Sequence, residues 1–296
     1  KTFHSFAAEI MELYPECFWN GAQLQTAPDA VQIDIIKGIL GSLPLNNPLA
    51  LRYNGQLTLI NDVQNALKLT KEAGFTPEEL RSVIKSNLKY IDMIEPRLAD
   101  IVPKTLSIKS LDQWSSQVYD LKDQQASDNQ QILLKPLGDV IKSSLQNAIA
   151  ADQELGKTTN TGKWKRRWLQ NSDGQKRMLD ERKRNEWWLA LSGVYQSYRK
   201  LLHGQGYYDY SDMIIEVNSQ LENNSDLRAM VQERFLYIQV DEFQDTNAAQ
   251  LKLANLVASH PGDEGKPNIM AVGDDDQSIF AFNGAELNNM LAFQNA

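Results

Sequence analysis

The stretch Phe235–Asn247, FLYIQVDEFQDTN, decides the fold that this sequence predicts. Its first half, Phe235–Val240, is rich in aromatic and β-branched residues and predicts a short strand that ends at two adjacent carboxylates, Asp241 and Glu242. Because neighbouring strand residues point to opposite faces, the two side chains cannot do the same work. One carboxylate suits Mg²⁺, which prefers oxygen ligands, and the other suits a water-polarising role at a phosphoryl group. The alternative is that both merely favour the N-terminus of the next helix.

A second strand is predicted one helix later. Ala248–Ala258 has the apolar spacing of a helix, and Asn268–Val272 is a short apolar run that ends at Gly273 and the acidic cluster Asp274-Asp275-Asp276. Strand, helix and strand form a βαβ unit, whose two strands run parallel. Ligands of parallel sheets gather at the carboxyl ends of the strands, and both acidic clusters are predicted to lie at that edge.

Four segments together resemble motifs of the superfamily 1 DNA helicases of the UvrD/Rep/PcrA type. Two long segments resemble motifs II and III of that family, and two shorter ones resemble motif Ib and the acidic motif before motif II; in chain order they are Thr2–Ala7, Tyr208–Ile214, Asp241–Asn247 and Val272–Ala285. The resemblance covers both ends of the chain, whereas the middle matches only as a helical insertion. It implies that the intact protein is an ATP-dependent helicase or translocase on single-stranded DNA, with the 3′ to 5′ polarity usual in the family.

The resemblance implies ATP and Mg²⁺ as cofactors and assigns roles at the nucleotide. Asp241 would coordinate Mg²⁺, and Glu242 would be the general base that orients the attacking water. Gln277 would sense the γ-phosphate, since its amide offers both a donor and an acceptor. Gln244 would couple the nucleotide site to the neighbouring motif, and Asp274 would lie among the nucleotide-binding residues.

The resemblance also implies contacts with the DNA strand, from Thr2, Phe3, His4, Phe280 and Phe282. Bases stack on aromatic rings in such sites, while core packing is the alternative for the two later phenylalanines. The sequence departs from the family at Asn283, where many members have Arg. An Asn cannot supply the charge with which Arg bridges a phosphate and a carboxylate, so the nucleotide–DNA coupling at this position is in doubt.

The fold class that follows is α/β: an incomplete RecA-like parallel sheet of the P-loop NTPase type with a large all-helical insertion. We expect residues 1–16 and 186–296 to form the partial motor domain and residues 17–185 to form the inserted helical domain. A helix start is predicted at Thr76-Pro77 and a helix end with a Gly cap at Gly204.

A phosphate-binding loop of the form GxxxxGK[ST] is expected upstream of Lys1, because the family has it before motif Ib. Within the chain, Ala151–Thr158, ADQELGKT, only imitates it, with Ala in the first glycine position. The sequence predicts an amphipathic helix before this segment rather than a strand, and a polar loop over Thr159–Lys163 rather than a helix N-terminus. Gly156 is therefore interpreted as a helix C-cap.

A basic segment stands out in an acidic chain. Lys163–Arg184 holds nine basic and three acidic residues and therefore a net charge of +6, with two Trp residues interleaved. Such a segment suits a phosphate backbone and stacked bases, which makes Lys165, Arg166 and Arg167 candidate nucleic-acid contacts. The alternative, a solvated helix face whose Trp residues pack inward, stays open.

Composition excludes several other classes. The 296 residues carry a net charge of −8, one Cys and three His, which argues against a disulfide scaffold, a zinc finger and a His-based metal site. No run is long and apolar enough for a membrane span, and we expect a cytoplasmic protein.

The chain reads as a piece of a longer protein that lacks its phosphate loop and a second RecA-like domain, and we expect it to be inactive by itself. Its partners would be single-stranded DNA or duplex/single-strand junctions. The pathway stays open among repair, replication restart, recombination and plasmid or phage replication. The alternative function is a non-catalytic nucleic-acid-binding or regulatory module that retains the helicase fold.

Overall fold

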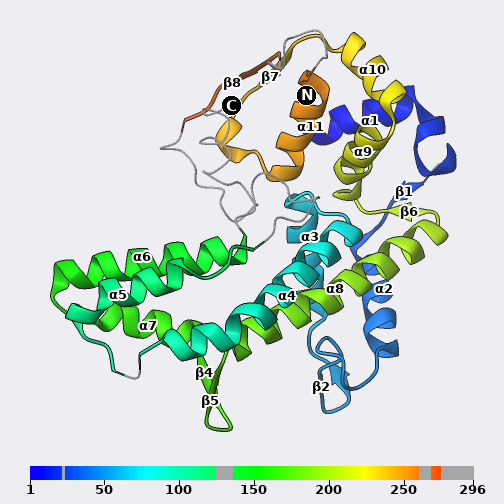
Figure 1. The fold of residues 1–296 in the computed structure, drawn as a ribbon. Coiled ribbons are helices and arrows are strands. Elements are labelled where there is room, and N and C mark those ends of the chain that lie inside the picture. The colour runs from blue at the N-terminus through cyan, green and yellow to red at the C-terminus, as the bar shows by residue number, and fades with distance from the viewer. Residues whose placement is uncertain (22–23, 104, 125–135, 260–267, 275–296) are drawn as a thin grey trace. The chain divides into compact units, whose positions relative to one another are not determined.

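The computed structural model describes residues 1–21, 24–103, 105–124, 136–259 and 268–274 (Figure 1). Helices predominate in these residues, and the strands form two-stranded sheets. The chain divides into two units, one of Lys1–Glu78 with Leu191–Ala296 and one of Glu79–Ala190. Both divisions fall inside a helix, α4 (Pro77–Ile101) and α8 (Leu179–Gly204). In the described ranges, none of the helices is both long enough and apolar enough to cross a membrane.

The first unit combines helices with three short sheets. Besides the ends of α4 and α8 it contains α1 (Phe3–Leu13), η1 (Pro15–Cys17), η2 (Trp19–Gly21), β1 (Gln25–Thr26), α2 (Asp29–Ser42), β2 (Arg52–Tyr53), β3 (Gln56–Leu57), α3 (Ile60–Glu72), β6 (Tyr207–Tyr208), α9 (Asp212–Asn223), α10 (Ser225–Arg234), β7 (Ile238–Val240), η3 (Phe243–Asp245), α11 (Ala248–Ala258) and β8 (Ile269–Ala271). Strands β1 and β6 pair in parallel, and β2 and β3 form an antiparallel hairpin.

One hydrophobic core holds α1, α9, α10 and α11 together. Ile10 of α1, Val217 and Leu221 of α9, Leu227 of α10 and Leu253 of α11 are fully buried in it. Each such aliphatic side chain contributes about 1.5–3 kcal/mol when it leaves water, so this core fixes α11, which packs on β7 and β8, to the other three helices.

The predicted βαβ order is confirmed. Strands β7 and β8 run parallel, with Ile238 opposite Ile269 and Val240 opposite Ala271, and α11 connects them. Helix α11 has the predicted bounds and begins with a capping box in which Asn247 and Gln250 satisfy each other's backbone N–H groups. Both strands are shorter than predicted, with three residues each. The RecA-like identity of this sheet stays a prediction, since the described residues pair only these two of its strands.

The second unit is helical with one hairpin. Besides parts of α4 and α8 it contains α5 (Ile108–Tyr119), α6 (Leu137–Leu155), α7 (Thr159–Trp168), β4 (Gln170–Ser172) and β5 (Gln175–Arg177). Its core includes the fully buried Ile91, Leu98, Leu111 and Leu145 together with Trp114. The antiparallel hairpin β4–β5 turns at Asp173 and Gly174, both with positive φ.

Three local predictions have clear outcomes. Helix α4 begins at Pro77, as predicted. The polar loop predicted over Thr159–Lys163 is wrong, because α7 begins at Thr159. Helix α8 ends at Gly204, but the left-handed glycine that closes it is Gly206, at φ +81°.

The predicted domain limits stay a prediction. The two units divide after Glu78 and after Ala190, whereas the predicted insertion runs from residue 17 to residue 185. The units describe which residues pack together, and the insertion is a statement about family organisation.

Candidate functional site

Asp241 and Glu242 lie at the carboxyl end of β7, and both are exposed to solvent. Glu242 adopts a left-handed backbone conformation, at φ 51° and ψ 46°, and its N–H donates to Asp241 Oδ1 at 3.0 Å. This conformation is uncommon for a non-glycine residue and gathers at functional sites when the surroundings enforce it. The carboxylate pair therefore sits in a constrained turn between β7 and η3.

Gln244 joins the two strand ends. Its Nε2 donates to Glu242 Oε2 at 2.6 Å, and its Oε1 accepts the Asp274 N–H at 3.1 Å. The side chain is buried, so these bonds form in a region of reduced dielectric, where they are stronger than in water. The backbone repeats the connection, because the Phe243 N–H donates to the carbonyl of Val272 at 2.9 Å.

Gly273 makes this arrangement possible. A Cβ at this position would lie 2.5 Å from Gln244 Oε1 and 3.1 Å from the Phe243 nitrogen. Any side chain would therefore displace the amide that holds Glu242. The sequence shows the glycine but not the close approach of Gln244 that requires it, so the sequence alone predicts no role for Gly273.

The site suits a Mg²⁺ ion that is held largely by other groups. In the part of the chain that the structure describes, no group of three or more His, Cys, Asp or Glu residues could hold a metal ion. Mg²⁺ commonly takes one or two carboxylates and completes its shell with water and substrate phosphates. The exposed Asp241 at the strand end fits that requirement.

Several predicted site residues lie outside the described residues. These are Gln277, Phe280, Phe282 and Asn283. The predicted approach of Gln277 to Asp241 and Glu242 therefore stays a prediction, as do the two aromatic DNA contacts.

The three predicted DNA contacts near the N-terminus, Thr2, Phe3 and His4, also make contacts within the protein. Thr2 caps α1 by accepting the Ser5 N–H at 3.2 Å, and Phe3 packs on the core of the first unit. His4 stacks on Tyr210, with ring centroids 4.2 Å apart, and burial lowers its pKa. Thr2 is exposed and the other two are half-buried, so their DNA role stays a prediction.

The acidic motif around Tyr208–Ile214 surrounds a buried lysine. Lys71 Nζ of α3 lies 2.7 Å from Asp209 Oδ2 and 3.1 Å from Asp212 Oδ1, and its side chain has no exposure. Burial opposes the ionisation of Asp209, but the Lys71 ammonium and further hydrogen bonds outweigh it and lower the Asp209 pKa. Nothing in the local sequence around Lys71 distinguishes it from an exposed helix lysine, so the sequence does not predict this role.

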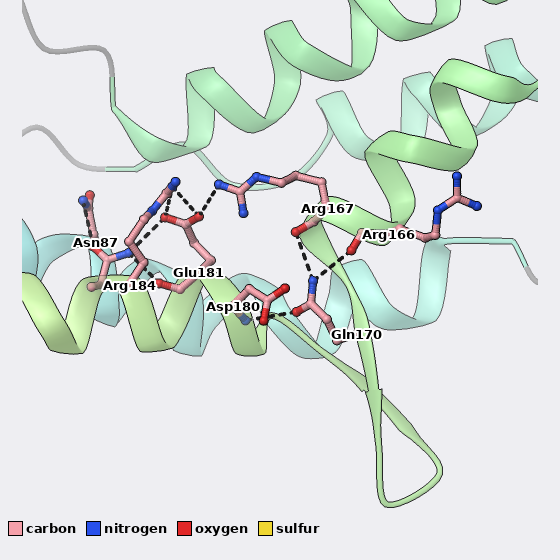
Figure 2. A network of polar contacts seen from close by, with 8 residues as sticks. Asn87, Arg166, Arg167, Gln170, Asp180, Glu181 and Arg184 are labelled. Atoms are coloured by element: carbon pink, nitrogen blue, oxygen red, sulfur yellow. Dashed lines mark hydrogen bonds and ion pairs between the residues drawn. The ribbon is translucent and has the colours of Figure 1, made fainter. Parts of the chain in front are cut away.

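Within the basic segment, the Trp and Arg side chains of α7 lie in different surroundings. Trp164 and Trp168 are buried in the core of the second unit and are not available for base stacking, which agrees with the inward-packing alternative for these rings. Arg167 donates to Glu181 Oε2 at 3.2 Å, and Arg184 binds the same carboxylate at 2.6 Å. Figure 2 shows the Arg166 guanidinium pointing the opposite way from that of Arg167. The three predicted contacts are therefore not equivalent.

At the segment that imitates a phosphate loop, Ala151–Thr158, a carboxylate of the protein lies where a phosphate would bind. Asp152 accepts the N–H groups of Asn160 at 2.9 Å and Thr161 at 2.8 Å, so its carboxylate fills the N-terminus of α7. Gly156 closes α6 in the left-handed conformation, as predicted. The prediction that no helix begins after this segment is wrong, because α7 begins at Thr159. The position that would bind a phosphate nevertheless already holds the Asp152 carboxylate.

A cavity of about 320 Å³ in the first unit lies away from the acidic strand ends. Trp19, Arg199, His203 and Glu216 are among the residues that line it, and none of its lining residues belongs to β7, η3 or α11. The candidate nucleotide site is thus an open sheet edge and not this cavity.

The fold and the motifs agree with the comparisons with known proteins. A family model of the UvrD/REP helicase N-terminal domain matches residues 1–296, and the chain belongs to this family.

Among curated proteins, the chain is similar to the probable DNA helicase II homolog of Rickettsia conorii (40% identity over 101 residues), to DNA helicase II of Haemophilus influenzae (35% over 115 residues) and to the ATP-dependent DNA helicase PcrA of Leuconostoc citreum (36% over 105 residues). These alignments cover 34%, 39% and 36% of the chain, but only 15%, 15% and 13% of the relatives.

Proposed function

We propose that this chain is part of an ATP-driven motor that moves along single-stranded DNA, and that Mg-ATP binds at the carboxyl ends of β7 and β8. The observation that supports this most directly is the Gln244 amide, which ties the Glu242 carboxylate to the backbone after β8. The family and the relatives named as DNA helicases support the same proposal.

Within this proposal the residues have separate tasks. Asp241, exposed at the strand end, holds Mg²⁺, which supplies charge neutralisation for the phosphates. Glu242 orients a water and accepts its proton, and Gln244 fixes the direction of the Glu242 carboxylate. Gln277 senses the terminal phosphate, and Asp274 lies beside the nucleotide.

On the DNA side, we propose that Thr2, Phe3 and His4 at the start of α1 meet the strand together with Phe280 and Phe282. The expected direction of movement is 3′ to 5′. Coupling between nucleotide and strand passes through the segment after β8, because Gln244 contacts the first residues of that segment.

The second candidate function is a non-catalytic nucleic-acid-binding module that keeps the fold. Asn283, at a position where many members of the family have Arg, favours it. The two candidates differ in one measurable property, DNA-stimulated ATP hydrolysis by the intact protein.

The test is Glu242→Gln in the intact protein. Loss of the general base is expected to lower kcat for DNA-stimulated ATP hydrolysis by about 10²–10⁴-fold. Single-stranded DNA binding should be retained, because the substitution keeps the side-chain shape. Glu233→Gln is the matched control, since Glu233 is exposed in α10 of the same unit. Hydrolysis by the Glu242→Gln protein at the wild-type rate, or no hydrolysis by the wild type, would contradict the proposal.

A further inference from the structure

The second unit contains a basic cavity that none of the helicase motifs uses. Its volume is about 830 Å³, and its lining residues come from α7, from the β4–β5 hairpin and from the segments before α5 and α7: Thr105, Leu106, Thr158, Gly162, Lys165, Arg166, Leu169, Gln170, Asn171 and Lys176. Three of these described lining residues are cations, and none of them is Asp, Glu or aromatic.

The spacing of α7 explains why only part of the basic segment reaches this cavity. Lys165 and Arg166 lie three and four residues after Gly162 and therefore share one face of the helix with it, and Leu169 directly follows the helix. Trp164 and Trp168 occupy the buried face. The remaining cations, Lys163 and Arg167, are four residues apart and are absent from the cavity lining.

Lys165 and Lys176 bring like charges together. Lys165 Nζ donates to the carbonyl of Pro103. Burial lowers the pKa of Lys165, and the neighbouring Lys176 ammonium lowers it further. Two adjacent ammonium groups repel each other, and an anion bound between them attracts both and offsets that repulsion.

Arg166 adds a third positive group to the same lining. Within the described ranges, no carboxylate lies at ion-pair distance from its guanidinium, whereas Arg167 is held by Glu181 (Figure 2). Asn171 and Gln170 supply neutral polar groups of the kind that contact phosphates and sugars.

We propose that this cavity is a phosphate-binding site in which Lys165, Lys176 and Arg166 hold the sugar-phosphate backbone of a nucleic-acid strand without contact to its bases. The proposal deepens the DNA-binding part of the proposed function and rests on it. The absence of aromatic residues among the described lining residues separates this site from a base-stacking platform. The proposed site contains Lys176, which was not among the three contacts predicted from the sequence, and does not contain Arg167, which was.

The test compares two double variants of the 296-residue chain, without nucleotide, in fluorescence-anisotropy titrations with a 20-nucleotide oligo-dT strand. Lys165→Ala with Lys176→Ala removes two cavity cations, and Lys163→Ala with Arg177→Ala removes two exposed cations outside the lining. Each lost phosphate contact lowers the salt slope of single-strand binding by about 0.7, so the cavity variant should lose about 1.4 in slope and roughly 20-fold in affinity at 0.1 M salt. The control pair should change affinity by less than about twofold.

An abasic strand of the same length tests the claim about bases. The ratio of wild-type to cavity-variant affinity should be the same for the abasic strand as for oligo-dT, because the cavity contacts only the backbone. Inorganic phosphate, added at constant ionic strength, tests as a competitor whether the cavity prefers free phosphate to a strand. If phosphate displaces the strand completely at millimolar concentration, or if the ratio collapses on the abasic strand, the backbone site is overturned.

Two further measurements keep the result independent of folding. In lysine acetylation read by mass spectrometry, the bound strand should protect Lys165 more than the exposed Lys163. Lys176→Gln, which removes the repulsion, should raise the thermal midpoint while weakening strand binding; a lower midpoint, or equal losses by the cavity and control pairs, overturns the site. Because no nucleotide is present, Glu242→Gln should bind like wild type, so failure of the cavity and failure of the motor proposal are distinguishable.

Discussion

At the scale of single residues, the candidate nucleotide site depends on a buried amide and a missing side chain. Gln244 spans the space between Glu242 and Asp274, and Gly273 leaves room for it. Glu242 has an unusual backbone conformation, and the amide binds its carboxylate. A carboxylate that is oriented before substrate arrives avoids the reorganisation that a free side chain would require.

The first residue-scale prediction concerns Gln244→Ala. Removing the amide frees the Glu242 carboxylate, so kcat for ATP hydrolysis by the intact protein should fall about 10–100-fold while KM for ATP changes little. Gln239→Ala is the matched control, because Gln239 is exposed on β7. A change in KM with kcat preserved would show that Gln244 binds substrate and does not position Glu242.

The buried ion pairs of Lys71 make a second residue-scale prediction. Lys71→Met would leave Asp209 and Asp212 without their cation in a buried site. The free energy of unfolding should fall by about 3–5 kcal/mol, because an uncompensated charge remains inside the protein. Denaturant unfolding followed by circular dichroism measures the loss. Lys68→Met is the control, since Lys68 is largely exposed on the same helix and pairs with Glu72.

At the scale of elements, α7 is held by a carboxylate from α6 at its N-terminus and by buried tryptophans along one face. Asp152 of α6 caps its N-terminus, and Trp164 and Trp168 fix its buried face. This leaves Lys165 and Arg166 on a face whose orientation is set by buried contacts rather than by the charges themselves. A rigid helix that presents cations costs less ordering on binding than a mobile basic loop would.

The element-scale prediction concerns Asp152 and pH. Burial opposes ionisation of Asp152, but its hydrogen bonds from Thr161 and Asn160 outweigh that effect and lower its pKa. A lowered carboxyl pKa means that the stabilisation is present above the unfolded-state pKa and is lost as pH falls through the folded-state value.

Asp152→Ala should therefore destabilise the second unit by about 2 kcal/mol at pH 7 and by less at pH 3. Thermal unfolding across this pH range measures the difference. Asp139→Ala, in the first turn of α6, is the control. An equal loss at both pH values would show that the carboxylate does not act through its charge.

At the scale of the whole molecule, the net charge of −8 contrasts with the local excess of cations in the second unit. The strand binding that we propose for this chain must therefore be local, since the overall field repels a polyanion. The curated relatives are much longer than the region that matches, so motor activity belongs to the intact protein in our proposal.

The whole-molecule prediction is that the 296-residue chain binds single-stranded DNA but does not turn over ATP. These 296 residues contain no GxxxxGK[ST] loop to hold the phosphates. A coupled ATPase assay with saturating oligo-dT should give no turnover above a no-protein blank. Turnover in the ordinary enzymatic range of about 1–10³ per second would refute the prediction.

Local sequence patterns determined the βαβ unit, the start of α4 and the bounds of α11, because hydrophobic period, a helix-starting Pro and a capping box act within a few residues. They also located Asp241 and Glu242 at a strand end.

Only the tertiary structure decided which basic residues share a surface. Lys176 meets Lys165 through the packing of a hairpin on a helix, and Arg167 is taken by Glu181 of another helix. The wrong loop prediction at Thr159–Lys163 has a similar cause. A carboxylate from α6 stabilises the start of α7 there, and the local polar sequence does not predict that contact. Contacts between residues distant in sequence depend on packing geometry, and no local period encodes that geometry.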